Sequence, residues 1–550
     1  MKIPSKNYII RTFTIVFIIL IFINQGMAQN TVGLIMNDAA QSYNGYTLFA
    51  PSTSKITYLI DNEGRLVNKW ESDYTPGLSA YLLEDGHLLR SAVLPSEDPN
   101  VTITGGFQKF EWDGTLVWNY YHGTQHHDIE PMPNGNVLMV VNDRQTKSAA
   151  IQAGRDPSLI DGANIRSLSI LEVSYTGETT GDIVWQWNAW EHLIQDFDST
   201  KDNFGVVSEH AELIDINFAK DGGQDWLHTN SVAYNEDLDQ ILVSNRNTNE
   251  IWIIDHSTTN SDLLYRWGNP IAYKAGAVDD QKLHGQHDAH WIVTGLPGEG
   301  NIMIFNNGQD RPDGDYSSAD EIVPPVDGSG IYELVVGSAY APTDVWWSYT
   351  APEPTDFNSP RYGGTQRLPN GNTLICNSDR GEFLEVNSSN EIVWRYISPV
   401  TSEGIIEQGT VTIDTLGIWI PNNQVFRCYK YAPDSPELDG KDLISGEPLK
   451  IYDGLIDVTY FKLFDNFPNP FNPTTNIEYT LTERTFITIA IYDLLGNRIR
   501  TLVNSAMEPG LQSITWNSLD DSGKFVSSGV YFYSLKAGDY TQTKKMILLR

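Results

Sequence analysis

Six of the eleven histidines in this 550-residue chain lie in three short segments, at 125–128, 225–231 and 284–290. Neutral imidazole is a good nucleophile, and protonated imidazole supplies both a hydrogen-bond donor and a proton. One cluster of such residues can therefore attack a substrate, stabilise charge and act as a general acid. The six are His126, His127, His228, His284, His287 and His290.

Arg246 follows the second of these segments, at the end of the stretch Ile241-Leu-Val-Ser-Asn-Arg246. Its planar guanidinium suits a tetrahedral oxyanion such as sulfate or phosphate. Transfer of such a group places charge on its peripheral oxygens, where fixed cationic donors contribute most. The residues therefore predict an anion-seeking pocket that transfers such a group.

A metal site is the main alternative, since His284, His287 and His290 with Asp288 could supply imidazole and carboxylate ligands. Their three-residue steps suit one face of a helix, whereas we expect a loop entering a strand, where only alternate residues share a face. For any single histidine, a hydrogen-bonded residue capping a strand is a further alternative. The sequence favours a site that uses no metal and no cofactor.

A repeating fold is needed to bring these distant segments together. Residues 46–431 repeat loosely, with short alternating strands, Asn-Gly or Asp-Gly turns, a tryptophan-bearing strand in each unit and no helical stretch. This pattern predicts an all-β fold, with a six-bladed β-propeller over 30–432; stacked sandwiches are the alternative. The six tryptophans are Trp70, Trp118, Trp187, Trp267, Trp347 and Trp394.

Propellers place the first strand of every blade around a central channel. We therefore expect His127, His228 and His287, which start such strands in three adjacent blades, to converge on one axis. A strand at 46–50 is expected to close the ring by joining a strand within 417–429.

Residues 1–28 are predicted to be a signal peptide, because cationic residues precede an apolar run at 13–23 and small residues end at Ala28. The run is too short to cross a bilayer as a helix. The mature protein is therefore expected to be exported, with no transmembrane segment. The net charge of the full chain, −34, disfavours nucleic acid as a partner.

Cys376 and Cys428 are the only cysteines. Export permits a disulfide, but one pair cannot hold together so long a chain. Whether the two residues pair is left open.

The end of the chain differs in character. Residues 433–460 are rich in proline, glycine and aspartate and predict a linker, and 461–550 predict a small Ig-like β-sandwich. In the latter, Phe467-Pro-Asn-Pro-Phe-Asn-Pro473, Tyr492-Asp-Leu-Leu-Gly496 and Lys545-Met-Ile-Leu-Leu-Arg550 resemble the C-terminal sorting domain of the type IX secretion system of Bacteroidetes. The resemblance implies export by that machinery, through the periplasm and outer membrane, to the cell surface or the medium.

Several propeller motifs together resemble the bacterial arylsulfate sulfotransferases. The resemblance spans nearly the whole propeller and implies six blades and transfer of a sulfuryl group from a phenolic sulfate ester to a phenolic acceptor. The implied route is ping-pong through a sulfohistidine, without a nucleotide donor. The motifs are Asp225-Trp-Leu-His-Thr-Asn-Ser-Val232, Ile241-Leu-Val-Ser-Asn-Arg246, Gln286-His-Asp-Ala-His290, Arg311-Pro-Asp-Gly314 and Gln366-Arg-Leu-Pro-Asn-Gly-Asn372.

Matched motif by motif, the resemblance implies that His287 is the nucleophile that becomes sulfated. His228 and Arg246 would hold the sulfuryl oxygens, with Asn230 assisting. His127 would bind or protonate the bridging oxygen.

His126 and His290 are further predicted substrate-binding residues. Asp128 after His127 matches Asp288 after His287, which favours His127 over His126 for the bridging oxygen. Two other functions stay open. One is a surface propeller that only binds anionic or glycan ligands, and the other is a sulfate-ester hydrolase in which water replaces the phenol.

Overall fold

The computed structural model describes most of the chain between residues 32 and 549. The predicted signal peptide, 1–28, lies outside the described residues, as does the linker beyond 449. Inside 462–549, five short stretches are also outside them: 464–465, 467–468, 482–483, 508–509 and 539. The described ranges are 32–94, 105–218, 224–402, 404–406, 423–449 and the rest of 462–549.

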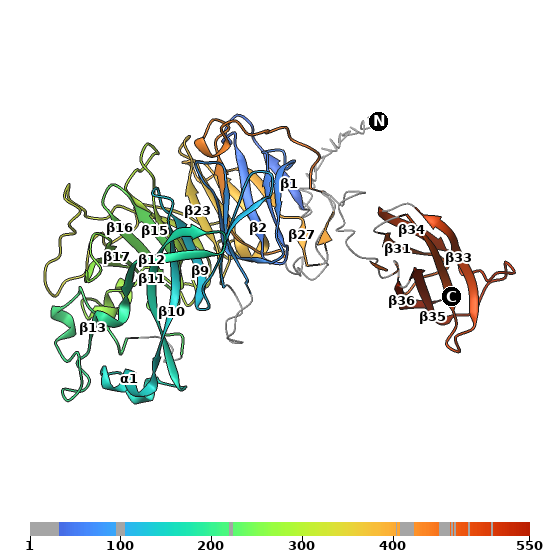
Figure 1. Ribbon diagram of the computed structural model, residues 1–550. Helices are drawn as coiled ribbons and strands as arrows, with labels where there is room; N and C mark the ends of the chain where they lie inside the picture. Colours follow the sequence, from blue (N-terminus) through green and yellow to red (C-terminus); the bar gives the residue numbers. More distant parts are fainter. Residues whose placement is uncertain are drawn as a thin grey trace, which may run out of the picture.

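Six antiparallel sheets of four or five strands follow one another between residues 33 and 431 (Figure 1). Numbered along the chain and written from the inner strand outward, the first three sheets are as follows. Sheet 1 contains β29 (Val425–Tyr431), β2 (Tyr46–Pro51), β3 (Ile56–Ile60) and β4 (Leu66–Glu71). Sheet 2 contains β5 (Pro76–Leu82), β6 (Leu88–Ala92), β7 (Gly106–Phe110) and β8 (Leu116–Tyr121). Sheet 3 contains β9 (Gln125–Pro131), β10 (Val137–Thr146), β11 (Asn164–Gly177) and β12 (Thr180–Asn188).

The remaining three sheets of this region are built in the same way. Sheet 4 contains β15 (Thr229–Asn235), β16 (Gln240–Asn245), β17 (Glu250–Asp255) and β18 (Leu263–Trp267). Sheet 5 contains β19 (His287–Trp291), β20 (Ile302–Asn306), β21 (Ser318–Ile322) and β22 (Trp347–Tyr349). Sheet 6 contains β23 (Gly364–Arg367), β24 (Thr373–Asn377), β25 (Glu382–Val386), β26 (Ile392–Ile397) and β1 (Gly33–Asn37).

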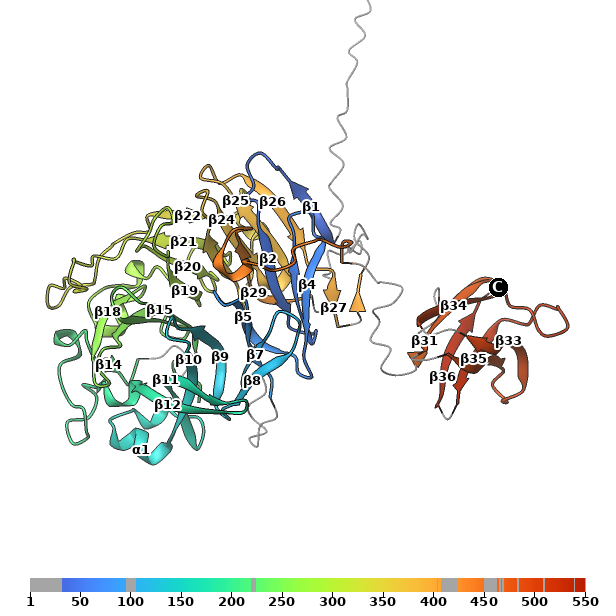
Figure 2. The same ribbon diagram turned by 45° about the horizontal axis from the view of Figure 1, so that its top comes forward.

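The inner strands of the six sheets form a closed circle. Strand β5 contacts β9, β9 contacts β15, and β15 contacts β19. Strand β19 contacts β23, β23 contacts β29, and β29 returns to β5. Figure 2 shows the sheets following one another around a common centre. The all-β, propeller-like arrangement predicted from the repeats is therefore present.

The outer edge repeats with the same order. Each of the six predicted tryptophans lies in the fourth strand of its sheet, and each indole N–H donates a hydrogen bond to the next sheet around the circle. Buried indole N–H groups need such partners. Because the sixth bond runs from sheet 6 back to sheet 1, the circle is closed here as well. The bonds are Trp70 to Glu111 O (3.0 Å), Trp118 to Thr180 O (3.1 Å), Trp187 to Ser261 O (2.8 Å), Trp267 to Pro342 O (2.7 Å), Trp347 to Asn390 Oδ1 (3.1 Å) and Trp394 to Asn62 O (2.9 Å).

The two ends of this region meet in sheet 1. Strand β2 pairs with β29, with Tyr46 opposite Tyr431 and Phe49 opposite Cys428, which confirms the predicted closure. Strand β1 adds a fifth strand to sheet 6, which the repeats did not predict. Cys376 and Cys428 are buried free thiols.

The expectation that the repeats contain no helix is wrong at one place. Helix α1 (Lys147–Gln152) lies between β10 and β11, where the Thr146 hydroxyl accepts a hydrogen bond from Ala149 N and caps the helix. Short 3-10 turns and two-stranded ribbons occupy other connections. The turns are η1 (Pro157–Leu159), η2 (Ala189–Glu191), η3 (Val207–Glu209), η4 (Pro270–Tyr273), η5 (Val278–Asp280), η6 (Pro354–Asp356), η7 (Ser378–Arg380) and η8 (Pro436–Leu438). The ribbons are β13 (Leu193–Ile194) with β14 (Ile214–Asp215), and β27 (Val400–Thr401) with β28 (Gly404–Ile405). Within the described residues, no helix reaches the length and apolar character that a bilayer crossing requires.

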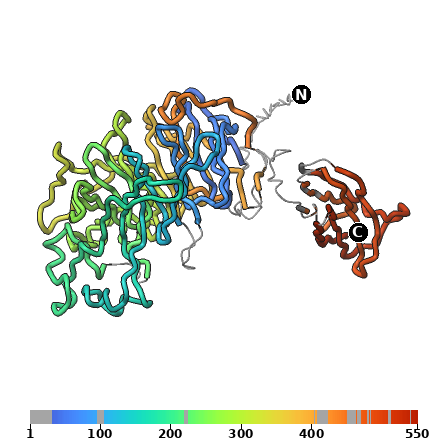
Figure 3. Tube along the Cα trace, viewed as in Figure 1, coloured from blue at the N-terminus to red at the C-terminus, as the bar shows by residue number. Residues whose placement is uncertain are grey.

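The C-terminal unit, red in Figure 3, consists of two sheets. The sheets share one hydrophobic cluster, in which Ile487, Ile489 and Ile491 are fully buried. The strands that the sequence predicts at 474–481, 485–492, 512–516, 529–537 and 540–549 are present. Strand β33 was missed, because it is an edge strand in which no side chain is fully buried. The Ig-like topology stays a prediction. The strands are β30 (Lys462–Leu463), β31 (Thr475–Leu481) and β34 (Gly510–Trp516) in one sheet, and β33 (Arg498–Met507), β32 (Thr485–Tyr492), β35 (Gly529–Ala537) and β36 (Tyr540–Leu548) in the other.

Candidate functional site

The inner strands that carry histidine begin irregularly. His127 (φ 55°), His228 (φ 50°) and Asp288 (φ 53°) have left-handed backbone conformations, and the pairing of β9, β15 and β19 with their neighbours shifts register at these points. Left-handed conformations are uncommon for residues other than glycine and concentrate at functional sites. A bulge at the start of a strand redirects its side chains.

Histidines from sheets 3 and 4 are in contact. The imidazole rings of His127 and His228 lie edge to face with centroids 4.8 Å apart. The Nδ1 atoms of His126 and His127 are 2.8 Å apart, so one of the two must carry the proton of this hydrogen bond. The structure therefore brings all three predicted imidazoles of these sheets together.

His228 is oriented by a carboxylate. Its Nδ1 lies 2.6 Å from Asp225 Oδ2. Burial raises the pKa of Asp225, but the hydrogen bond and the charge of His228 outweigh this effect and hold that pKa at about 2. Asp225 is therefore ionised at neutral pH, and His228 must donate its Nδ1 proton to it. The Nε2 atom of His228 remains for other chemistry.

His287, in sheet 5, is held in one tautomer by Asn307. The Asn307 amide nitrogen donates to Ser359 O (2.6 Å) and Tyr362 O (2.9 Å), so its oxygen faces His287 Nδ1 at 2.7 Å and must accept a proton from it. The lone pair of the neutral ring is then on Nε2. This atom is buried and has no hydrogen-bond partner among the described residues.

Burial keeps three imidazoles of the cluster neutral, those of His126, His127 and His287. Burial lowers the pKa of His287 well below its usual value; the bond to Asn307 opposes this, and the positive charges of His228, Arg246 and Arg427 add to it. Burial, with the charge of His228, lowers the pKa of His126 to about 4. Burial also lowers the pKa of His127 strongly, with contributions from His228, His126 and His287. A neutral His287 with a free Nε2 has the protonation state of a nucleophile.

Arg246 and Asn230 lie beside these histidines. Arg246 N donates to His228 O at 3.2 Å, and the Arg246 guanidinium binds Gln309 and lines a polar pocket of about 220 Å³. Asn230 is fully buried and donates to Gln286 O at 2.7 Å, in the residue before His287. Asn230 therefore contacts the residue before the predicted nucleophile, and Arg246 contacts His228.

His290 is not brought into the cluster. Its Nδ1 lies 3.0 Å from Asp288 O and 3.7 Å from Asp288 Oδ2, within its own strand. His284 Nδ1 instead faces Gln281 at 3.4 Å. The described residues contain no group of three or more His, Cys, Asp or Glu arranged to hold a metal ion. A substrate-binding role for His290 stays a prediction.

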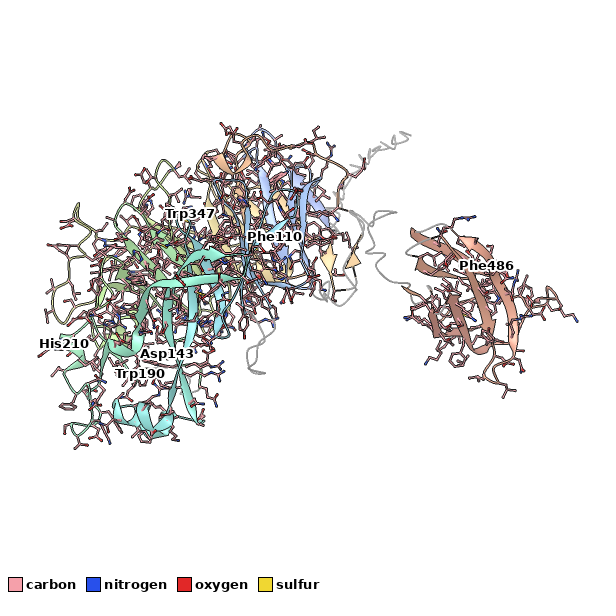
Figure 4. The ribbon with its side chains drawn as sticks, viewed as in Figure 1. Phe110, Asp143, Trp190, His210, Trp347 and Phe486 are labelled. Atoms are coloured by element: carbon pink, nitrogen blue, oxygen red, sulfur yellow. The ribbon has the colours of Figure 1, made fainter. Side chains whose placement is uncertain are left out.

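Asn307 was missed in the sequence, although its position carried a signal. It follows the end of β20 just as Arg246 follows the end of β16, so the two occupy matching places in neighbouring repeats. Two aromatic rings near His287 were also missed as site residues: Tyr362 at 6.0 Å and Phe426 at 6.4 Å between ring centroids. A larger surface pocket, of about 380 Å³ beside Trp346 and Trp347, contains none of the predicted site residues (Trp347 is labelled in Figure 4).

The fold and the site define a propeller-like protein with imidazoles and a guanidinium gathered near the inner ends of its sheets. Residues 31–408, more than half of the chain, match the family described as Arylsulfotransferase (ASST), and the chain belongs to this family. Residues 465–549 match the secretion system C-terminal sorting domain. This type IX signal means that the protein is exported to the cell surface or secreted.

Comparisons with known proteins add little beyond the family. A search of curated proteins finds no match. Among solved structures, a protein of unknown function from Bacteroides caccae is 12% identical with a TM-score of 0.38, over 70% of this chain and 99% of that one. A second, from Desulfotomaculum acetoxidans, is 10% identical with a TM-score of 0.34, over 71% and 100%. Virginiamycin B lyase from Staphylococcus aureus is 10% identical with a TM-score of 0.33, over 68% and 87%. Scores this low support no conclusion about function.

Proposed function

We propose that this protein is an exported aryl-sulfate sulfotransferase that moves a sulfuryl group from a phenolic sulfate ester to a phenolic acceptor. Family membership supports the reaction class. In this proposal the six sheets are the blades of one closed propeller, and the sorting domain serves as an address for the type IX machinery. No nucleotide donor or cofactor takes part.

The observation that carries the proposal is the buried, unpartnered Nε2 of His287, opposite an Nδ1 that is fixed by Asn307. In the first half-reaction the Nε2 lone pair attacks sulfur, the N–S bond forms and the bond from sulfur to the phenolic oxygen breaks. His127 donates a hydrogen bond to the departing phenolate, which takes its proton from solvent. Tyr362 and Phe426 give the aryl group an aromatic wall.

In the second half-reaction, the oxygen of an acceptor phenol attacks sulfur and the N–S bond breaks. The phenolic proton passes to the neutral imidazole of His127 and from there to solvent, so the site returns to its starting state. His228, supported by Asp225, and Arg246 stabilise charge on the sulfuryl oxygens in both steps. Asn230 holds the chain beside His287.

The test is to incubate the protein with 4-nitrophenyl sulfate alone and locate any adduct by mass spectrometry. A stoichiometric sulfuryl adduct on His287, discharged by added phenol, is the expected result. Nitrophenol release that is independent of phenol identifies a hydrolase. Ligand binding without any nitrophenol release identifies a binding protein. Either of the last two results removes the proposal.

A further inference from the structure

Arg427 lies in β29, outside the residues that match the arylsulfotransferase family, and is 95% buried. Its Nη2 lies 2.7 Å from Asp128 Oδ2 in sheet 3, and its Nε lies 3.0 Å from Asp288 Oδ1 in sheet 5. Its Nη1 donates to Tyr81 Oη at 3.2 Å. One guanidinium thus joins carboxylates from two different sheets.

Each of these carboxylates belongs to the residue that follows a predicted catalytic histidine. One histidine is the proposed nucleophile, and the other is predicted to act on the bridging oxygen. Asp128 follows His127, and Asp288 follows His287. Whatever fixes the aspartates therefore fixes the backbone from which those imidazoles project.

Each aspartate also binds the inner strand of the next sheet. Asp128 Oδ2 accepts from Val232 N at 3.1 Å, and Asp288 Oδ2 accepts from Thr365 N at 2.7 Å. Arg427 Nη2 adds a long contact to Asn230 O, at 3.5 Å. Arg427 is therefore the shared partner of two aspartates that join the inner strands of sheets 3 and 4 and those of sheets 5 and 6.

The pairing also has an electrostatic consequence. Two buried carboxylates would be costly without a cation, because the interior cannot solvate them. They also lie beside imidazoles that must stay neutral to act as nucleophile and proton carrier. A fixed guanidinium compensates the carboxylates and disfavours protonation of both rings.

We propose that Arg427 is a positioning residue for sulfuryl transfer, which holds His127 and His287 at reacting distance through Asp128 and Asp288. This inference rests on the proposed function. It predicts that Arg427 affects the chemical step and its pH dependence rather than donor binding.

The groups facing the two imidazoles decide how pH acts. His287 faces His228, Arg246, Arg427 and the neutral Asn307. His127 faces His228 and Arg427, together with its neighbour His126 and with His287. Loss of the Arg427 charge leaves two carboxylates uncompensated, so the pKa of each imidazole rises. Protonation of the nucleophile then begins at a higher pH.

The test compares Arg427→Gln and Arg427→Lys with Lys430→Gln. Lys430 is a suitable control because it is a fully buried cation in the same strand, paired with Glu385 at 2.8 Å and without contact to Asp128 or Asp288. Turnover of 4-nitrophenyl sulfate with excess phenol is measured from pH 5 to 9. Histidine ring titration by NMR is measured in the same variants.

In Arg427→Gln, we expect kcat to fall roughly 10- to 100-fold, with KM changed less than about threefold. We also expect the acid limb of the pH–rate profile, where turnover falls as the pH is lowered, to move to higher pH. Arg427→Lys keeps the positive charge but loses the planar guanidinium that contacts both carboxylates. This variant should restore the position of the acid limb more fully than it restores kcat. Lys430→Gln should lower Tm without moving the limb.

The inference is overturned if folded Arg427→Gln retains kcat and the acid limb of the parent, or if Lys430→Gln moves the limb equally. Where the Gln variant does not fold, unchanged kcat in Arg427→Lys overturns it. The NMR titration separates this failure from failure of the proposed function. An upward shift of the ring pKa values in Arg427→Gln supports the placement even in a protein that transfers no sulfuryl group, and unchanged pKa values contradict it.

Discussion

The outer and inner edges of the six sheets follow opposite rules. On the outer edge, the same residue type makes the same hydrogen bond to the next sheet six times. On the inner edge, no two strands present the same side chains to the site. Three strands bring histidine to the site, whereas β5, β23 and β29 bring Tyr81, Thr365 and Arg427.

The difference shows how a repeating scaffold acquires a single site. Six equivalent tryptophan contacts fix the sheets relative to one another, so each inner strand is free to differ. The irregular starts of β9 and β19, with left-handed His127 and Asp288, are tolerated because the regular outer strands hold the sheets in place. Stability should therefore depend mainly on the outer edge, and turnover on the inner edge.

The largest effect on turnover is expected for His287→Ala. Removal of the nucleophile should lower transfer from 4-nitrophenyl sulfate to phenol roughly 10⁴-fold or more, with the folded state retained by circular dichroism. His210→Ala is the control, since His210 is an exposed histidine of the connection between sheets 3 and 4 and is labelled in Figure 4. Substantial turnover by folded His287→Ala would exclude the assigned nucleophile.

Arg246→Gln should have the next largest effect. Loss of one fixed cationic donor at the sulfuryl oxygens is expected to lower kcat roughly 10²–10³-fold. The matched control is Arg395→Gln, because Arg395 pairs with Glu382 in sheet 6 and makes no contact with the histidines among the described residues. Steady-state rates of both variants check the prediction, and equal losses would contradict an inner-edge role for Arg246.

The pH dependence of stability should reveal the buried histidines of the inner edge. Since burial lowers the pKa of His126 to about 4 and also lowers that of His287 well below its usual value, the unfolded chain binds more protons than the folded one below about pH 6.5. The free energy of unfolding should therefore decrease as pH falls from about 6.5 toward 4. Urea titrations at several pH values measure this decrease. His126→Asn should reduce it, and an unchanged slope would argue against a neutral, buried His126.

Trp70→Ala should have the smallest effect on turnover and a large one on stability. Trp70 is fully buried and bonds sheet 1 to sheet 2, so the free energy of unfolding should fall by about 3–5 kcal/mol. Turnover per folded molecule should stay within about twofold, because the site is distant. Denaturant unfolding and active-site titration check the two values. A large loss of specific turnover would show that the edges are coupled.

The repeats could be recognised in the sequence alone. One tryptophan in each repeat and the Asn-Gly or Asp-Gly turns reflect local strand and turn preferences, which a single sequence displays. The same repeats placed His127, His228 and His287 at the inner ends of their strands. Strand β33 and helix α1 were missed, because an edge strand with no fully buried side chain and a six-residue helix capped by Thr146 leave weak periodic signals.

Only the tertiary structure decided which side chains meet. The contact of Arg427 with Asp128 spans 299 residues, and that of Asn307 with His287 joins two strands of one sheet. Neither contact can be deduced from a periodic pattern in the sequence, because each depends on where the ends of strands and turns lie in space. The tautomer of His287 follows from a contact within one sheet, and the partners of Asp288 follow from contacts between sheets, so both could be assigned only from the folded structure.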